Sequence, residues 1–411
     1  DEALRRVVEG ETIQKDYREQ AARELGKSDT DEGDRGLRYL VVNGPDADKI
    51  AAIGEVEKRR RFKVVPDVLG ALDASSPAVR SAAAKALATI KDSKALSPLA
   101  AALTKYAAER EIFEGAIIAV FQGLSVDEVV KASESDDKVL KGLAIKSLAQ
   151  FIEQGRANPR VLDSLKQRLA DPDIEIKRAA AYALARVNDA DVVAKLVTLQ
   201  KDSDGAVREQ VAVAVARSSL ANANDLLLAM LEDSAPGVKR AAADGLRTRK
   251  VAGAVQKLKF QVKNPSPEVR AAVVAALTDL STDADWDGLF QIWSDALFDT
   301  EPQVKVAGLR GLMRRKDARL PGLFAGPVRD SDKAVKIAAL DALGATGDPA
   351  SVEYITGALL EAQDRDVKLA ALKSLETLNI DAAKKPIMEF VKNEQDAELK
   401  KRANEVFDHL P

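Results

Sequence analysis

Residues 233–249 read DSAPGVKRAAADGLRTR, and close variants of this stretch return along most of the chain. Each variant has an apolar anchor, which is Val238 here, then a basic residue, small residues and another apolar residue eight positions after the anchor. Positions within a repeat are counted from this anchor. Self-similarity with a period of about 31 residues predicts a solenoid, in which each repeat contacts only its neighbours. The anchors are Val79, Ile112, Leu140, Ile176, Val207, Val238, Val269, Val304, Val335, Val367 and Leu399.

The pattern within each repeat is helical. Apolar or small residues fall at the anchor and at positions 4, 7 and 8, which is the spacing of one helix face. Three residues before the anchor, Asp or Ser fills eight of the eleven repeats and is suited to cap a helix N-terminus. Pro77, Pro236, Pro267 and Pro302 follow at the first helical position, where the missing N–H is harmless. A second apolar segment, such as residues 192–199, completes a helix–turn–helix repeat.

A longer motif connects the repeats to a known family. The motif D-x-x-x-x-V-[KR]-x-A-A-x-x-A-L occurs as DPDIEIKRAAAYAL at residues 171–184 and as DSDKAVKIAALDAL at residues 330–343. In this motif the chain resembles HEAT repeats, most closely the short HEAT-like subtype first associated with phycobilisome lyases. The resemblance implies an all-α fold, an α-solenoid or superhelix of about twelve HEAT-like helix–turn–helix repeats. It implies little about function, because HEAT arrays serve many roles.

The two ends of the chain differ from the array. We expect residues 1–36 to form an amphipathic helix (1–26) and an acidic linker (27–36), and residues 37–61 to form a degenerate capping repeat. The helix is expected to fold over the open end of the array or, alternatively, to be a mobile docking element. Residues 62–411 form the array, and Arg402 and Asn404 give its last repeat the polar outer face of a cap. Since the chain starts with Asp1 and not Met, we expect an earlier targeting segment to be missing.

Composition argues against several classes of function. Cysteine is absent, which excludes disulfides, thiol nucleophiles and thiolate metal sites. A cysteine-free chain slightly favours an exported, periplasmic compartment of a bacterium over the cytoplasm. The one histidine, His409, argues against histidine-based catalysis and metal binding, so we expect no cofactor and no metal. A net charge of −3 gives no general attraction to nucleic acid, and no apolar run is long enough to span a membrane.

A basic residue follows the anchor in ten of the eleven repeats, and only Phe113 departs. Such a ladder has the appearance of a track for a polyanion. The resemblance to HEAT repeats implies instead that this residue pairs with an aspartate six residues earlier and links adjacent repeats. The chain supplies such pairs, for example Asp171 with Lys177 and Asp233 with Lys239. We therefore predict that the ladder is part of the scaffold.

The resemblance also implies that positions 2, 6, 9 and 10 face the concave side of the solenoid. The repeat anchored at Ile112 is unusual there, with Phe113, Ile118 and Phe121 as candidates for a hydrophobic partner site. Alternatively, the N-terminal helix or the irregular segment 150–160 buries these residues.

Arginine is the second candidate feature of the concave positions. Its planar fork binds carboxylates well, which favours a partner protein with an acidic surface. Glu209, Asp244, Asp279 and Asp341 share the same stripes, so a mixed, solvated face is the alternative. The arginines concerned are Arg178, Arg186, Arg217, Arg240, Arg247, Arg310 and Arg314.

A third feature is the aromatic stripe of Trp286, Phe290, Trp293 and Leu297, on the outer helix of a repeat longer than the others. Stripes of this kind are usually part of the core, and the alternative is that Trp286 is an exposed anchor for a partner.

These observations predict a non-catalytic scaffold or adaptor that binds partner proteins along the concave face. One alternative is a lyase or chaperone-like factor for a tetrapyrrole-carrying protein. Another is a nucleic-acid-binding HEAT protein, for which the mixed charges are unfavourable.

Overall fold

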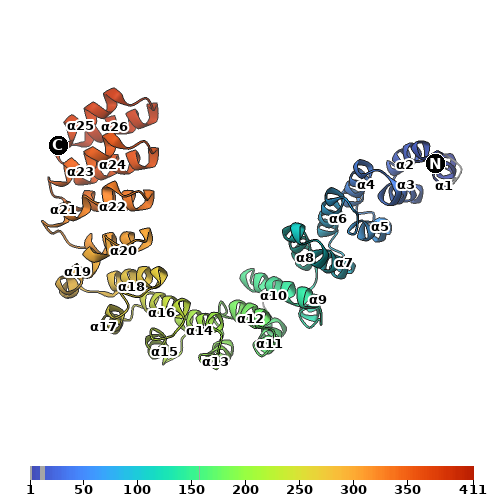
Figure 1. The fold of residues 1–411 in the computed structure, drawn as a ribbon, viewed down its shortest axis with the longest axis horizontal. Coiled ribbons are helices and arrows are strands. Elements are labelled where there is room, and N and C mark those ends of the chain that lie inside the picture. The colour runs from blue at the N-terminus through green and yellow to red at the C-terminus, as the bar shows by residue number, and fades with distance from the viewer. Residues whose placement is uncertain (1, 10–13, 157) are drawn as a thin grey trace. The chain divides into compact units, whose positions relative to one another are not determined.

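The computed structural model describes residues 2–9, 14–156 and 158–411, and every regular element in these ranges is a helix (Figure 1). The chain divides into two compact units, unit 1 within residues 1–187 and unit 2 at residues 188–411. The expectation of an all-α repeat fold is therefore confirmed.

Unit 1 contains twelve α-helices and three 3-10 turns among its described residues. They are α1 (Glu2–Glu9), α2 (Lys15–Gly26), α3 (Asp31–Asn43), α4 (Asp46–Arg59), η1 (Phe62–Val64), α5 (Val65–Ala71), α6 (Pro77–Ile90), η2 (Ser93–Ala95), α7 (Leu96–Lys105), η3 (Ala107–Glu109), α8 (Arg110–Gly123), α9 (Val126–Ala132), α10 (Lys138–Glu153), α11 (Pro159–Arg168) and α12 (Ile174–Leu184).

Unit 2 continues the same alternation of short and long helices. Its elements are α13 (Ala190–Val197), α14 (Gly205–Arg217), α15 (Ala223–Met230), α16 (Pro236–Thr248), η4 (Ala252–Ala254), α17 (Val255–Lys259), α18 (Pro267–Leu280), η5 (Asp283–Asp285), α19 (Trp286–Ala296), α20 (Pro302–Leu312), α21 (Leu320–Phe324), η6 (Pro327–Arg329), α22 (Lys333–Thr346), α23 (Ser351–Glu361), α24 (Arg365–Leu378), η7 (Asp381–Ala383), α25 (Lys384–Asn393) and α26 (Ala397–His409).

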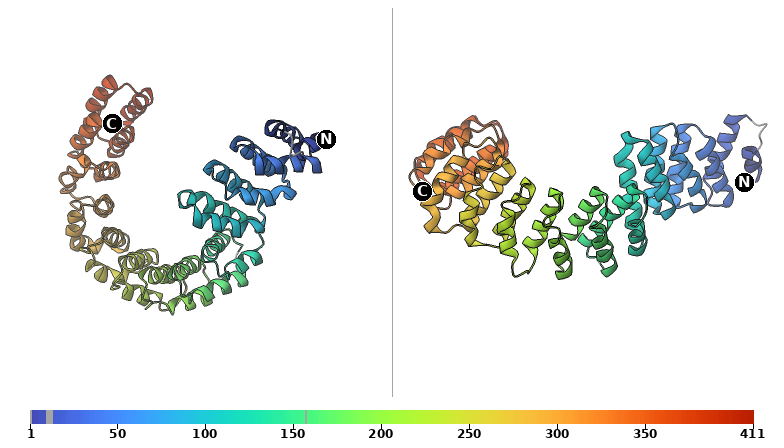
Figure 2. Two further views of the ribbon diagram at one scale, coloured as in Figure 1. Left: turned by 45° about the vertical axis from the view of Figure 1, so that its right-hand side comes forward. Right: turned by 60° about the horizontal axis from the view of Figure 1, so that its bottom comes forward.

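Within each unit the helices form two layers (Figure 2). From α4 onward each even-numbered helix packs against the next even-numbered helix of its unit, and each odd-numbered helix packs against the even-numbered helix that follows it. We call the even-numbered set the inner helices and the odd-numbered set the outer helices. The pairs from α3–α4 to α11–α12 and from α13–α14 to α25–α26 are the repeats that the sequence predicts.

The predicted caps explain where most inner helices begin. Asp204 accepts the N–H of Val207 at 3.0 Å, and Asp137, Asp173, Asp332, Asp364 and Asp396 cap their own helices in the same way. Ser76 and Ser266 make no such side-chain bond, although we expected them to. A proline at the first position of α6 and α18 leaves fewer N–H groups to cap.

In most repeats the basic residue after the anchor pairs with a carboxylate of the following repeat. Arg270 on α18 donates to both carboxylate oxygens of Asp299, at 2.7 and 2.8 Å. Its guanidinium also donates to the carbonyl oxygens of Asn264 and Pro265 in the turn before α18, while Asp299 accepts the N–H of Glu301. A single ion pair therefore fixes two turns and the contact between two repeats.

The same arrangement recurs, so the scaffold role of the ladder is confirmed. One detail of the prediction is wrong, because the carboxylate that receives the bond belongs to the next repeat and not to the same one. The aspartate six residues before each basic residue serves the preceding repeat. The further pairs are Arg80–Glu109, Lys141–Asp171, Arg208–Asp233, Lys305–Asp330 and Lys368–Glu394.

The N-terminal region differs from the prediction of one helix and a linker. Two helices, α1 and α2, pack on α3, and α3 begins within the expected linker. The side chain of Thr30 accepts the N–H of Gly33, and acidic residues in the first turn favour the positive end of the helix dipole. At Gly36, a Cβ would lie 2.7 Å from the carbonyl oxygen of Ala22, so this glycine permits the close packing of α2 and α3. The acidic run is therefore a helix start.

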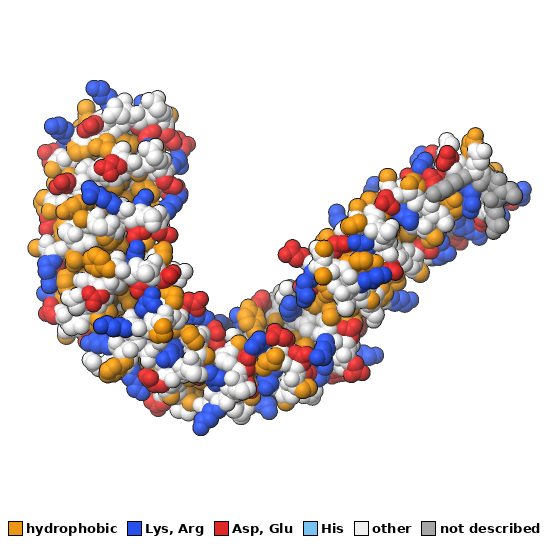
Figure 3. Space-filling model, viewed as in Figure 1, with side chains coloured by type: hydrophobic (Ala, Val, Ile, Leu, Met, Phe, Trp, Pro, Cys, Tyr) orange, Lys and Arg blue, Asp and Glu red, His pale blue; other side chains and the backbone are white. Residues whose placement is uncertain are grey.

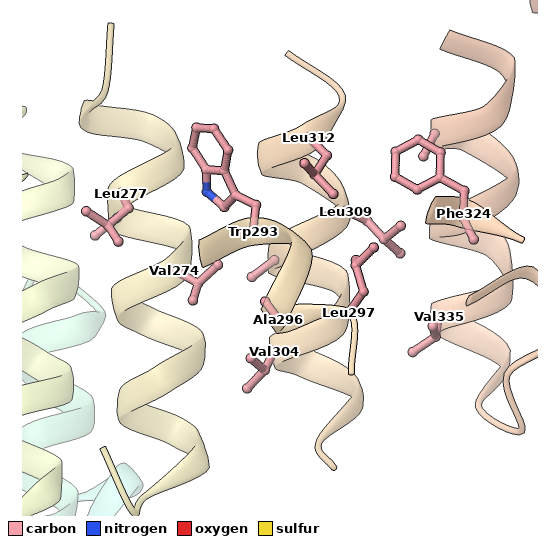
Figure 4. Packing of buried hydrophobic residues seen from close by; sticks show 14 of the residues in the cluster. Val274, Leu277, Trp293, Ala296, Leu297, Val304, Leu309, Leu312, Phe324 and Val335 are labelled. Atoms are coloured by element: carbon pink, nitrogen blue, oxygen red, sulfur yellow. The ribbon is translucent and has the colours of Figure 1, made fainter. Parts of the chain in front are cut away.

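The aromatic stripe of the long repeat belongs to the core, as expected. Trp286, Trp293 and Leu297 are buried and Phe290 is half-buried, which excludes Trp286 as an exposed anchor. Figure 4 shows Trp293 between α18 and α20, beside Leu277 and Leu312 of those helices. A Cβ at Gly311 would overlap the indole ring, so the absence of a side chain there makes room for the tryptophan.

The ion pairs of the ladder should contribute measurably to the free energy of unfolding of unit 2. We expect Arg270→Met to lower the free energy of unfolding by about 1–3 kcal/mol, because it removes hydrogen bonds from a charged group and leaves Asp299 without its partner. The change is measured by urea denaturation followed by circular dichroism. Arg365→Met is the control: Arg365 pairs with Asp396 and Glu398 at the surface, so little change is expected. Equal effects of the two variants would contradict the ladder's role.

The ladder also predicts a pH dependence. Bonds from Arg208 and Arg270 lower the pKa of Asp233 and of Asp299 below the usual value of about 3.9. A carboxyl group with a lowered pKa in the folded state stabilises the fold above its unfolded pKa and loses that contribution as the pH falls through the folded pKa. We expect the free energy of unfolding to decline below about pH 4. In the Asp233→Asn/Asp299→Asn variant this decline should be less steep. Denaturation curves between pH 7 and pH 3 test this, and parallel declines would refute it.

Candidate functional site

The inner helices of unit 2 present a shared surface, which we call the inner face. On α20 the anchor Val304 and Leu312 at position 8 are buried, whereas Gln303 at position −1 and Arg310 at position 6 are exposed. Position 2 is half-buried, as Val306 shows. The same positions recur on the other inner helices because the ladder holds successive repeats in register. Figure 3 shows charged side chains of both signs interspersed on the visible surface.

Two of the predicted arginines of unit 2 are occupied by acidic neighbours. Arg240 donates to Glu209 and lies 3.7 Å from Asp244. Arg247 lies 3.4 Å from Asp244 and 3.3 Å from Asp279. These pairs join α14, α16 and α18 across the inner face. The mixed face that we considered as the alternative is therefore present here, and these two guanidinium groups are partly neutralised.

The other three arginines of unit 2 differ from one another. Arg314 donates to the carbonyl oxygen of Thr278 and to the hydroxyl of Ser281 at 2.6 Å, so it holds the C-terminal end of α18. This position suits a cation, because the end of a helix carries partial negative charge. Arg217 and Arg310 are exposed, and neither makes an ion pair with a described residue. Of these five arginines, these two keep their guanidinium groups open to a ligand.

The predicted arginines of unit 1 lie on or just after α12. Arg178 pairs with Glu175 at 2.6 Å. Arg186 stacks on the ring of Tyr182, with its guanidinium carbon 3.4 Å from the ring centroid, and lies 3.8 Å from Glu153. Both arginines are therefore engaged within unit 1.

A shallow depression of about 420 Å³ lies on the inner face of unit 2. Its floor is formed by Ala271 and Ala272 of α18, and Arg240, Asp244, Glu268 and Gln303 surround them. Glu268 lies 3.9 Å from Arg240 and is largely exposed. Carboxylates and small apolar groups thus meet in this depression of the inner face.

The predicted hydrophobic partner site at Phe113, Ile118 and Phe121 is wrong in its main part. Phe113 and Phe121 are 0% exposed, whereas Ile112, which we took as the anchor, is 41% exposed. The register of this repeat is therefore shifted by one residue, and Phe113 is the anchor. Ile118 is only half-buried, and it alone keeps part of the predicted exposure.

The local surroundings explain the shift. The 3-10 turn η3 leads into α8 and places Phe113 beside the ring of Tyr106, with centroids 6.4 Å apart. The guanidinium carbon of Arg80 lies over the same Tyr106 ring, 3.9 Å from its centroid. The N-terminal helices do not cover these phenylalanines, because α1 and α2 pack on α3, whereas α6, α7 and α10 pack on α8. The signal was present in the sequence, since Ile117, Val120 and Phe121 stand at positions 4, 7 and 8 from Phe113.

Neither a metal-binding cluster nor a membrane-spanning helix is found among the described residues. Within residues 2–9, 14–156 and 158–411, no group of three or more acidic, histidine or cysteine side chains is placed to hold a metal ion. In the same ranges, none of the helices is both long enough and apolar enough to cross a bilayer.

Comparison with known proteins identifies the repeats. A family model described as HEAT repeats matches residues 14–117, 126–216, 223–300, 290–376 and 320–407. Yeast importin-beta (Kap95p) is 14% identical with a TM-score of 0.56, covering 99% of this chain and 66% of its own. The structure of Kap121p bound to Ste12p is 12% identical with a TM-score of 0.57, covering 96% and 51%. These two likenesses show the fold alone.

A structure of the phycocyanin lyase subunits is also similar. The complex of CpcE and CpcF from Nostoc sp. PCC7120 is 18% identical with a TM-score of 0.35, covering 70% of this chain and 95% of its own. A TM-score at this level carries no argument about function. No curated protein matches the sequence significantly.

The corrected register of α8 is testable. We expect Phe113→Ala to lower the free energy of unfolding by about 3–5 kcal/mol, because it removes a fully buried ring. Ile112→Ala should change stability little, since this side chain is largely exposed. Chemical denaturation of both variants decides between the registers, and the reverse order of effects would restore Ile112 as the anchor.

Proposed function

Because the chain belongs to the HEAT-repeat family, we propose that it is a non-catalytic scaffold that binds one or more partner proteins along its inner helices. The observation that carries this proposal is the repeated inner face of unit 2. Seven inner helices, from α14 to α26, expose equivalent positions on one layer. A partner can be held by many weak contacts spread over such a surface, and no single repeat has to form a pocket.

The structural contacts of the carboxylates support the non-catalytic part of the proposal. Asp299 and its equivalents bind the ladder, and Asp204 and its equivalents cap helices. In the depression, Asp244 and Glu268 are shared with Arg240. A catalytic carboxyl group usually needs an environment that shifts its pKa toward its task, and these groups have structural partners instead.

A protein partner suits the inner face better than a nucleic acid does. Arg240 and Arg247 are partly neutralised by acidic neighbours, so the face offers alternating charges and no basic groove. Arg217 and Arg310 remain open to acidic groups of a partner. Kap121p, whose fold is similar, was solved with the protein Ste12p bound, which supports a protein as the ligand class.

A site-specific photo-crosslinking experiment tests the proposal. A photoreactive amino acid is placed at Lys373 on the inner helix α24 and, as the control, at Glu353 on the outer helix α23 of the same repeat; both sites are exposed. We expect one protein to be crosslinked from position 373 and not from position 353 in extracts of the native source. Mass spectrometry identifies the adduct. Crosslinks from the outer helix alone, or to nucleic acid, would overturn the proposal.

A further inference from the structure

An apolar row runs along four consecutive inner helices of unit 2. Position 2 carries Ala271 on α18, Val306 on α20, Ile337 on α22 and Leu369 on α24, and all four are half-buried. They rest on the core while each keeps part of its surface accessible. On α14 and α16 the same position carries the charged residues Glu209 and Arg240. The row therefore begins at α18, and the other exposed positions beside it are mostly polar.

The spacing of this row selects a type of ligand. Packed helices lie about 8–10 Å apart, so the four side chains span roughly 24–30 Å in three nearly equal steps. An α-helix rises about 1.5 Å per residue, and residues seven apart lie on one face and about 10.5 Å from each other. A helix laid along the row, crossing the inner helices, would place every seventh residue against one repeat. Four residues seven apart occupy about 22 residues of helix and span about 31.5 Å, slightly more than the row itself.

Charges at two points along the row give the ligand a direction. The depression at the α18 end is lined by Ala271, by the carboxylates of Asp244 and Glu268, and by Arg240, the one cation that these two carboxylates share there. One turn away from Val306, Arg310 projects from α20 without an ion pair among the described residues. The next residues at position 6, Asp341 and Lys373, pair with each other at 3.0 Å. Arg310 is thus the uncompensated charge beside the middle of the row.

We propose that this row is the docking site for an amphipathic α-helix of a partner protein. The helix presents a large apolar residue at every seventh position. It carries a basic residue at the end that meets Ala271, and an acidic residue on the flank that faces Arg310. This inference deepens the proposed scaffold function and rests on it, because it assigns the partner's recognition element to one part of the inner face.

A synthetic peptide tests the inference directly. The probe is a fluorescein-labelled peptide of about 24 residues with leucine at four positions seven apart, lysine near one end and glutamate on one flank of the middle turn. Binding to the full chain is followed by fluorescence anisotropy. A scrambled peptide of the same composition is the reference. We expect the designed peptide to bind at least about tenfold more tightly than the scrambled one. Equal affinities would overturn the inference.

Variants of the protein locate the site. We expect Arg310→Glu to weaken the peptide about tenfold and a peptide with lysine in place of the facing glutamate to regain that affinity. Lys257→Glu is the matched control, because it makes the same change of charge at an exposed position of the outer helix α17, away from the row. Ile337→Asp should also weaken binding about tenfold or more. Leu360→Asp, at an exposed position of the outer helix α23, should not weaken binding. Circular dichroism confirms that each variant is folded.

The outcomes separate this inference from the proposed function. Identical peptide affinity in Arg310→Glu and Lys257→Glu, without rescue by the charge-reversed peptide, refutes the docking row. If the crosslink from Lys373 then persists in the Ile337→Asp variant, the scaffold function stands and the partner uses another part of the inner face. If position 373 of the otherwise unchanged chain gives no protein crosslink, the scaffold function is refuted, whatever the peptide experiment shows.

Discussion

The ion pair between the basic residue after an anchor and a carboxylate of the next repeat, which recurs in most repeats, is the constraint on which the array depends. The contacts between repeats are made largely by Ala, Val and Leu, and apolar contact is non-directional. A bidentate pair such as Arg270–Asp299 has one geometry. Because the same arginine holds the turn before its helix, and the same aspartate holds the start of the next one, repeat spacing and helix position are set together. The regular inner face follows from this.

Much of the fold could be predicted from the sequence, because the signals are local. Helix caps, prolines at the first turn and apolar positions 4, 7 and 8 all act within one repeat. The predictions were wrong where contacts with neighbouring segments determine which residues are buried and where a helix begins. Whether Ile112 or Phe113 enters the core depends on Tyr106 and the turn before α8, and the acidic run at Asp31 became a helix start because it could pack on α2.

The candidate site was harder to predict than the fold. Seven arginines at the predicted concave positions had the appearance of one basic surface, yet four of them have a partner about a repeat away in sequence. Arg247 meets Asp279 and Arg314 meets Thr278, which no pattern within a single repeat reveals. Position 2 was considered for its charges, whereas its apolar members on α18 to α24 were visible only once their partial exposure was known. Which side chains pair and which stay exposed therefore depends on how successive repeats pack on one another.

The tryptophan over Gly311 makes one repeat unlike the others. Where neighbouring repeats meet through the ladder and small side chains, one interface resembles the next, and a whole repeat could be duplicated or deleted without creating a new kind of contact. Trp293 needs a residue without a side chain on the following helix, and only a matched pair of helices provides it. An exchange of α19 or α20 alone for the equivalent helix of another repeat would therefore lose this fit, so these two helices have to change together.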